Sequence, residues 1–147
     1  MSFLDKLFGE SKQEEKIEKT SEGKILAKPF NISLSFTPLR LAANKSNSVN
    51  VNVKVTNITP DPQLVSVDVL LPKAAFMGFE PSCINKAYEK RIGQVKPGET
   101  ITVSVPIWGG SQTRPAEYEI GVTVFAHYIG YDKVLSYMKT KTRLRVV

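Results

Sequence analysis

Gln94-Val-Lys-Pro-Gly-Glu-Thr100 is the stretch that decides the fold class of this chain. Adjacent proline and glycine predict a tight turn, because proline fixes its own φ angle and glycine accepts conformations closed to other residues. After the turn, apolar residues recur at every second position, at Ile101, Val103, Val105 and Ile107. That is the period of a strand with one buried face. A turn that leads into such a strand is typical of antiparallel β-structure.

The same alternation of apolar and polar residues occurs on both sides of this turn. It covers residues 32–36, 49–55, 65–71 and 118–124, and we expect a last strand over 134–147. Thr37-Pro38 interrupts the first of these segments, which is expected to be an edge strand that changes sheets before Leu39 and Leu41. The number and length of the strands predict an all-β fold, an immunoglobulin-like two-sheet antiparallel sandwich of about seven strands.

Residues 73–95 lack a clear alternation. We expect them to be irregular, with a short helix around Asn85 to Lys90. Within them, Ala74-Ala-Phe-Met-Gly-Phe79 is apolar for a loop, and such a crossing segment usually covers the open edge of the core. A hydrophobic patch or a small-molecule pocket is the alternative for this segment.

The last two strands can be paired residue by residue. Pairing Ile129 with Lys133 leaves a three-residue loop, which is a common hairpin length. This register places Glu117 opposite Arg145 and Glu119 opposite Arg143. Facing pairs of opposite charge contribute about 0.2–1 kcal/mol each, so the charges favour this register.

The last strand also carries a stripe of cations on one face, formed by Lys139, Lys141, Arg143 and Arg145. Such a stripe is either an anion-binding or nucleic-acid-binding surface or a solvated face that discourages pairing with other chains. In the register above only Lys139 and Lys141 lack an acidic partner. The solvated face is the favoured interpretation.

The hairpin end gathers aromatic side chains, and we take it as the candidate partner-binding surface. Aromatic residues contribute a large contact area at low entropic cost. The candidates are His127, Tyr128, Tyr131 and Tyr137, with Tyr131 at the turn as the strongest of them. The alternative is a cross-strand aromatic ladder in which Phe125 lies beside Tyr137.

The first 28 residues divide into two segments ahead of a domain over 29–147. Residues 1–9 predict a short amphipathic helix, because Phe3, Leu4, Leu7 and Phe8 share one helical face before Gly9. Residues 10–28 are rich in Glu, Lys and Ser and predict a flexible charged linker. The apolar face of the helix is a candidate for docking to a partner groove or an anionic membrane surface.

The net charge of +6 lies on the domain, because residues 1–28 carry six lysines and six acids. A basic domain favours acidic partners. The chain has one cysteine, Cys83, and its first eight residues lack the pattern of a secretion signal. We therefore expect a cytoplasmic protein, with a peripheral membrane position as the variant that the N-terminal helix allows.

The sequence offers no arrangement of residues that demands catalysis. It contains one histidine and one cysteine, and it shows no spacing typical of metal ligands, a catalytic triad or a phosphate-binding loop. We expect a non-enzymatic protein without a cofactor or a structural metal.

Five blocks of the sequence, read in order, resemble the CARDB-like and NEW3-like immunoglobulin sandwiches of archaeal and bacterial proteins. They are Phe36-Thr-Pro38, Val49 to Asn57, Val65 to Pro72, Ile92 to Glu99 and Ala116-Glu-Tyr-Glu-Ile120. The resemblance covers about residues 30–147. It implies a seven-stranded sandwich that acts as an adhesion, scaffold or interaction module, and it brings no catalytic motif.

The sequence thus predicts a protein-protein interaction or scaffold module. The first alternative is a peripheral membrane protein held by residues 1–8. The second is anion or nucleic-acid binding through the basic last strand, which no nucleic-acid motif supports.

Overall fold

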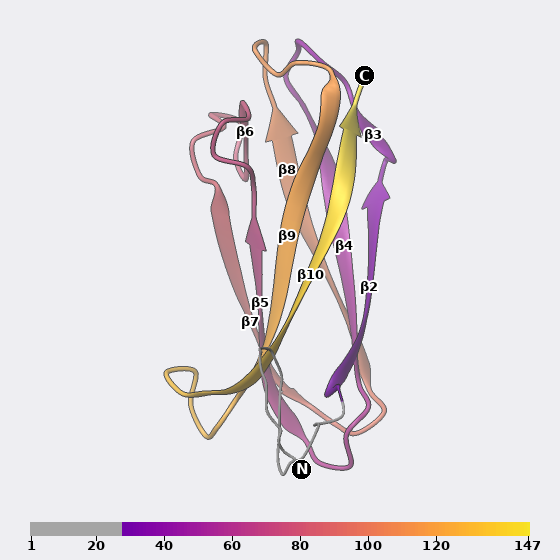
Figure 1. The fold of residues 1–147 in the computed structure, drawn as a ribbon, viewed down its shortest axis with the longest axis vertical. Coiled ribbons are helices and arrows are strands. Elements are labelled where there is room, and N and C mark those ends of the chain that lie inside the picture. Colours follow the sequence, from indigo (N-terminus) through magenta and orange to yellow (C-terminus); the bar gives the residue numbers. More distant parts are fainter. Residues whose placement is uncertain (1–27) are drawn as a thin grey trace, which may run out of the picture.

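The computed structural model describes residues 28–147, which form two β-sheets packed face to face (Figure 1). A five-stranded sheet has the order β3-β10-β9-β5-β7, and a four-stranded sheet has the order β2-β4-β8-β6. The strands are β2 (Phe30–Thr37), β3 (Arg40–Leu41), β4 (Asn47–Asn57), β5 (Gln63–Leu70), β6 (Met77–Gly78), β7 (Ala87–Val95), β8 (Thr100–Gly109), β9 (Ala116–His127) and β10 (Val134–Val146). The predicted all-β, two-sheet fold is confirmed. The helix predicted over 1–9, with Phe3, Leu4, Leu7 and Phe8, and the linker over 10–28 lie outside or at the edge of the described residues.

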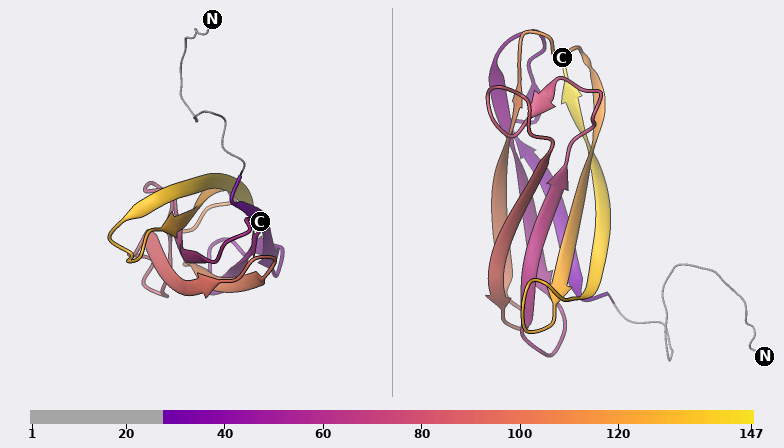
Figure 2. Two further views of the ribbon diagram at one scale, coloured as in Figure 1. Left: turned by 90° about the horizontal axis from the view of Figure 1, so that it is seen from below. Right: turned by 90° about the vertical axis from the view of Figure 1, so that its left-hand side faces the viewer.

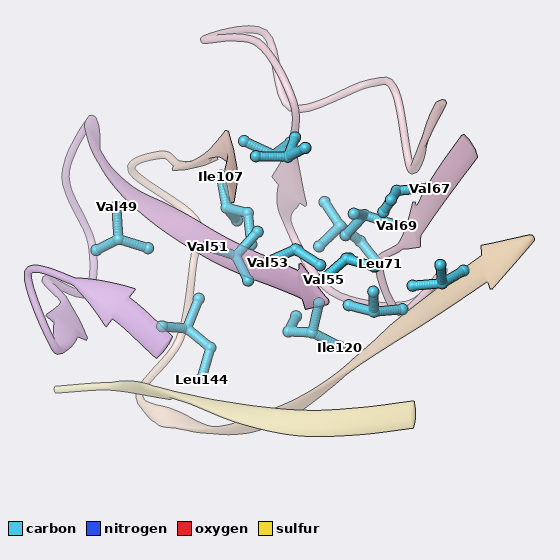
Figure 3. Packing of buried hydrophobic residues seen from close by; sticks show 14 of the residues in the cluster. Val49, Val51, Val53, Val55, Val67, Val69, Leu71, Ile107, Ile120 and Leu144 are labelled. Atoms are coloured by element: carbon cyan, nitrogen blue, oxygen red, sulfur yellow. The ribbon is translucent and has the colours of Figure 1, made fainter. Parts of the chain in front are cut away.

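The core forms where the alternating residues of the two sheets meet (Figure 3). β4 contributes every second residue from Val49 to Val55, and β5 contributes Val65, Val67 and Val69, all with an exposed fraction of 1% or less. Ile120 and Leu144 of the last hairpin close the core from the five-stranded sheet. Branched side chains suit this position, because they lose little rotamer freedom in a strand and pack well on a pleated surface.

The chain changes sheets at Pro38, as the sequence predicts. β2 pairs with β4 in the four-stranded sheet, whereas β3 pairs in parallel with the end of β10 in the other sheet. The peptide bond between Thr37 and Pro38 is cis. Leu41, directly after this crossing, is fully buried in the core.

The prediction for residues 73–95 is wrong in part. The helix expected around Asn85 to Lys90 is absent from the structure, and β7 runs there instead, paired with β5 at the edge of its sheet. Tyr88, Ile92 and Val95 of this strand belong to the core or pack against it, and three consecutive charged residues, Glu89 to Arg91, are exposed between Tyr88 and Ile92. An edge strand exposed in this way lacks the apolar alternation by which buried strands are recognised.

The predicted register of the last hairpin is confirmed from Ala116 to Ala126, and Glu117 and Glu119 face Arg145 and Arg143. It is wrong at the tip. A bulge between Val134 and Ser136 shifts the pairing, so that Val134 pairs with His127 and the loop is longer than three residues. A bulge leaves an extra residue unpaired on one strand and changes the direction of its side chain, and Leu135 at this bulge is 61% exposed.

The loops fall into two groups at the two ends of the sandwich (Figure 2). One end holds the start of β2, the β4–β5 and β7–β8 connections and the β9–β10 loop. The other end holds the β3–β4 and β8–β9 loops, the long segment from β5 to β7 and the last residue of the chain. We call them the hairpin end and the opposite end.

Candidate functional site

The β9–β10 loop projects beyond the body of the sandwich at the hairpin end (Figure 1). Its backbone is closed by hydrogen bonds from Tyr128 N to Lys133 O (3.0 Å), from Gly130 N to Tyr128 O (2.7 Å) and from Lys133 N to Gly130 O (3.2 Å). Ile129 has a φ of 67°, in the left-handed region. A β-branched residue pays a steric cost in that conformation, so the loop holds Ile129 in a defined position.

This hairpin carries a cluster of exposed apolar side chains, which we call the hairpin patch. Its members are Tyr128, Ile129, Val134, Leu135 and Tyr137, with exposed fractions between 51% and 81%. They are five of the eleven large hydrophobic residues that are exposed in the described chain. Clustered exposure of this kind marks an interaction surface, whereas single exposed apolar residues are normal.

Two of the four predicted partner-binding residues belong to the patch and two support it from behind. Tyr128 and Tyr137 are more than half exposed, as a contact role requires. The prediction is wrong for His127, whose exposed fraction is 7%. Tyr131, the favoured candidate, is half-buried, because its ring lies edge-on against His127 (5.1 Å between centroids) and under the guanidinium of Arg91 (4.8 Å).

The aromatic ladder proposed as the alternative is also present. Phe125 lies beside Tyr137, with 6.1 Å between ring centroids, and its centroid is 6.0 Å from that of His127. The ladder and the patch therefore coexist, because the ladder holds one face of Tyr137 and leaves the rest of that ring in solvent.

His127 fixes the base of the hairpin through two hydrogen bonds. Its Nδ1 donates to Lys133 O (3.2 Å), since a carbonyl oxygen only accepts. In the neutral ring Nε2 is then an acceptor, and the hydroxyl of Ser66, a residue with an exposed fraction of 1%, donates a hydrogen bond to it (2.7 Å). This pair ties the end of β9 both to β5 and to the hairpin loop, so that the patch sits on a rigid support.

Asp68 lies two residues after Ser66 on the same outer face of β5, directly opposite Glu89 of β7. Burial and the charge of Glu89 raise the pKa of Asp68, and the nearby His127 counters this in part. An acid whose pKa is raised by folding binds its proton more tightly in the folded state. Its ionised form therefore destabilises the fold at neutral pH, and this penalty disappears at a pH below the unfolded pKa of about 3.9.

We expect Asp68→Asn to raise the melting temperature at pH 7 by about 1–2 °C, since a partly exposed charge contributes on the order of 0.5 kcal/mol. At pH 3 the variant and the parent protein should melt together. Thermal unfolding followed by circular dichroism at both pH values measures this. Asp132→Asn on the exposed hairpin loop is the control, and an equal gain there would contradict the explanation.

The basic stripe on β10 is largely paired with acids. Glu119 contacts Lys141 (2.9 Å), and Glu117 contacts both Arg143 and Arg145 (3.8 Å each). The expectation that Lys141 lacks an acidic partner is therefore wrong, because the pairing is diagonal along the strands. Lys139 is in none of the ion pairs of residues 28–147, and its ammonium lies 5.9 Å from the ring of Tyr137.

The apolar segment from Ala74 to Phe79 covers the core at the opposite end, as expected. Ala75 and Met77 are buried, and Phe79 packs against Tyr88. Cys83 lies in the same region beside Gly110, and burial raises the pKa of its thiol. It is far from His127, which lies at the hairpin end. Residues 28–147 contain no cluster of three metal-ligating side chains and no helix suited to crossing a membrane.

Sequence reasoning missed three members of the patch, Ile129, Val134 and Leu135. A signal was available, because Tyr128-Ile129 and Val134-Leu135 are adjacent apolar pairs on either side of the turn. Both members of each pair are more than half exposed, because Tyr128 and Ile129 lie in the loop after β9 and the bulge interrupts the alternation at Val134 and Leu135. Apolar pairs on both sides of a hairpin turn, beyond the reach of the core, are therefore the signal for this surface.

Comparison with known proteins gives a likeness in fold. No protein-family model matches this sequence, and no curated protein matches it. Among solved structures, the chain is similar to native α2-macroglobulin from Escherichia coli, spanning domain MG7 to the C-terminus, with a TM-score of 0.57 and 17% identity over 82% of this chain. Trypsin-activated α2-macroglobulin from the same organism gives a TM-score of 0.53 and 18% identity over 83% of this chain.

A third similar structure is the FixG-related protein from Vibrio parahaemolyticus, with a TM-score of 0.51, 14% identity, and coverage of 82% of this chain and 98% of that one. The present chain spans only 17% and 7% of the two α2-macroglobulin chains. At these identities the likeness establishes a shared β-sandwich fold.

Proposed function

We propose that this protein is a non-enzymatic interaction module, an immunoglobulin-like sandwich that binds a protein partner through the hairpin patch. The observation that carries the proposal is the group of five exposed apolar side chains on one braced hairpin. Fully burying a large apolar side chain is worth about 1.5–3 kcal/mol, so a few of these residues provide enough energy for a specific contact. From the sequence pattern alone, we also propose that the chain is related to the CARDB-like and NEW3-like sandwiches and that it acts in the cytoplasm.

The shape and charge of the hairpin end indicate what kind of partner surface would be complementary to it. The patch lies on a projecting hairpin, which fits a concave apolar groove. Lys133, Lys139 and Arg91 are exposed around it, against Asp132 on the loop and Glu89, which pairs with Arg91 (3.8 Å). An apolar groove with an acidic rim is therefore the complementary surface, since charges at the rim of an interface guide association and select partners.

Replacing Leu135 and Tyr137 together by Ser is expected to weaken partner binding at least tenfold, or about 1.4 kcal/mol. Both side chains are more than half exposed, so the protein should stay folded, with a small fall in melting temperature from the lost contact between Tyr137 and Phe125. The partner is found by placing a photo-crosslinking residue at position 135 in the protein produced in its native cells. The exposed position Thr102, on the outer face of β8, is the control site for crosslinking.

Leu39→Ser is the matched control for binding, because Leu39 is 76% exposed and lies in the β2–β3 connection instead of the patch. Equal weakening by Leu39→Ser, or equal crosslinking from positions 135 and 102, would contradict the proposal. A crosslinked species of twice the chain mass would identify a second copy of this protein as the partner.

A membrane surface is the second candidate, favoured by the place where the domain begins. β2 starts at the hairpin end, so residues 1–8 are joined to the same end of the sandwich as the patch. Co-sedimentation of the full chain with anionic and neutral vesicles tests this. Binding that is lost when Phe3, Leu4, Leu7 and Phe8 are all replaced by Ser would favour the membrane over a protein groove.

A further inference from the structure

A cavity of about 790 Å³ lies at the opposite end of the sandwich from the hairpin patch. Three loops form its walls, the β3–β4 loop at Asn44, the segment from Pro72 to Phe76, and the β8–β9 loop from Ser111 to Arg114, together with Tyr118 of β9. This size is within the range of small-molecule and peptide sites.

The loops around the cavity are held together by internal hydrogen bonds. The hydroxyl of Thr113, fully buried, accepts from Gly110 N (2.7 Å) and donates to Phe76 O (2.5 Å), which joins two of the walls. Asn44 N donates to Thr113 O (2.9 Å) and joins the third. The cavity is therefore preformed, and a ligand would bind without first ordering its walls.

The ammonium of Lys86 braces the same region from behind. It donates to the carbonyl oxygens of Ala75 (2.6 Å), Met77 and Cys83 (3.4 Å). The ammonium of Lys86 is thus bonded to the backbone of the wall. Lys86 does not line the cavity, so the positive charge inside the cavity comes from another residue.

That residue is Arg114, the one charged side chain among those that line the cavity. It takes part in none of the ion pairs of residues 28–147, and its carbonyl oxygen is held by the hydroxyl of Tyr118 (2.7 Å). Amide and hydroxyl groups of Asn44, Gln112 and Ser111 line the same space. The lining thus offers one cation and several hydrogen-bond donors, and no carboxylate opposes an anion.

The rest of the lining is apolar. Pro72, Ala74, Ala75 and Phe76 form one wall, and the ring of Tyr118 lies near Arg114. An apolar wall beside a single guanidinium matches a ligand with one anionic group on an apolar body. A guanidinium binds a planar carboxylate through two parallel hydrogen bonds. Arg114 alone can therefore bind one carboxylate group.

We propose that this cavity binds a carboxylate group attached to an apolar body. The carboxylate pairs with Arg114 and the neighbouring amides, and the apolar body lies against the wall from Pro72 to Phe76. This site is separate from the hairpin patch and does not depend on the function proposed for it. The carboxylate belongs either to the C-terminus of a peptide or to a small organic acid.

The test is a titration of the isotopically labelled full chain, followed by NMR chemical shifts. The probes are N-acetyl-Ala-Ala-Phe with a free carboxylate and 4-phenylbutyrate, each compared with its carboxamide. Both acids are expected to shift signals of residues 42–46, 72–76 and 111–118, and each carboxamide should bind at least tenfold more weakly. Tighter binding of the tripeptide would assign the site to a peptide C-terminus, and tighter binding of 4-phenylbutyrate to a small organic acid.

Arg114→Ala is expected to weaken binding of the acids at least tenfold, whereas Arg143→Ala on the outer face of β10 should leave it unchanged. Ala74→Trp adds bulk to the apolar wall of the cavity and leaves Arg114 in the sequence, and it should weaken binding as well. The proposal is overturned if no shifts appear at millimolar probe, if acid and carboxamide bind equally, or if a folded Arg114→Ala or Ala74→Trp protein binds like the parent.

Discussion

Replacing Asn57 by Ala is expected to lower the free energy of unfolding by about 3 kcal/mol, because every hydrogen-bonding group of this buried amide is used. Nδ2 donates to Val95 O (3.0 Å) and Asp61 O (2.9 Å), and Oδ1 accepts from the backbone N (2.9 Å) and the hydroxyl (2.7 Å) of Thr59. The side chain is fully buried. Its loss removes the acceptor of Thr59 N and the buried donor to Val95 O, whereas Asp61 O keeps the hydroxyl of Thr59 (2.9 Å).

Asn52→Ala is the matched control for this prediction. Asn52 is on the same strand and makes three side-chain hydrogen bonds, one fewer than Asn57, to Ser35, Thr37 and Ser104 on the outer face. Water replaces those contacts, so the expected loss is below about 1 kcal/mol. Urea unfolding followed by the fluorescence of Trp108 measures both variants. Equal losses would show that burial of Asn57 is not the cause.

Lys86→Met is expected to lower the free energy of unfolding by about 2 kcal/mol. Methionine keeps most of the apolar stem, so the change mainly removes the charged donor to the carbonyl oxygens of Ala75, Met77 and Cys83. A hydrogen bond from a charged group is worth about 1.5–3 kcal/mol, part of which is recovered when the freed carbonyls meet water. Hydrogen exchange should accelerate between residues 75 and 85 more than in β4.

Lys54→Met is the control, since Lys54 is exposed on the outer face of β4. We expect it to change the unfolding free energy by less than about 0.5 kcal/mol. A similar loss in the two variants would mean that removing any lysine has this effect, and the brace at the opposite end would then have no special role.

The strands of the core could be predicted from the sequence because their signal is local. In β4 and β9 one face packs on the core and the other faces water, so apolar and polar residues alternate in the same way as buried and exposed positions. The charges at Glu117, Glu119, Arg143 and Arg145 then fixed the register of the last hairpin. β7 lacked such a signal, because an edge strand with water on most sides carries Glu89, Lys90 and Arg91 where a central strand carries valine.

The candidate sites depend on contacts between residues that are far apart in the sequence. Such contacts produce no periodic pattern in the sequence from which they could be predicted. The burial of His127 is explained by Ser66, 61 residues earlier, and the cavity wall at Phe76 is fixed by Thr113, 37 residues later. A list of aromatic residues therefore found Tyr128 and Tyr137 but could not tell them from the half-buried Tyr131. The bulge at Val134 also could not be predicted, and it exposes Leu135 by breaking the alternation.

The short parallel pairing of β3 with β10 affects how the domain resists tension applied between its two ends. Val147 N donates to Leu41 O (3.0 Å) and Ala43 N donates to Val147 O (2.8 Å), next to the pairing of Arg40 with Arg145. β2 starts at the hairpin end of the sandwich and β10 finishes at the opposite end (Figure 2). Tension between Pro29 and Val147 therefore acts along the strands, and it shears these hydrogen bonds together instead of opening them one at a time. Tension on the β9–β10 loop would peel that hairpin pair by pair, so the domain is stiffer between its ends than at its tip.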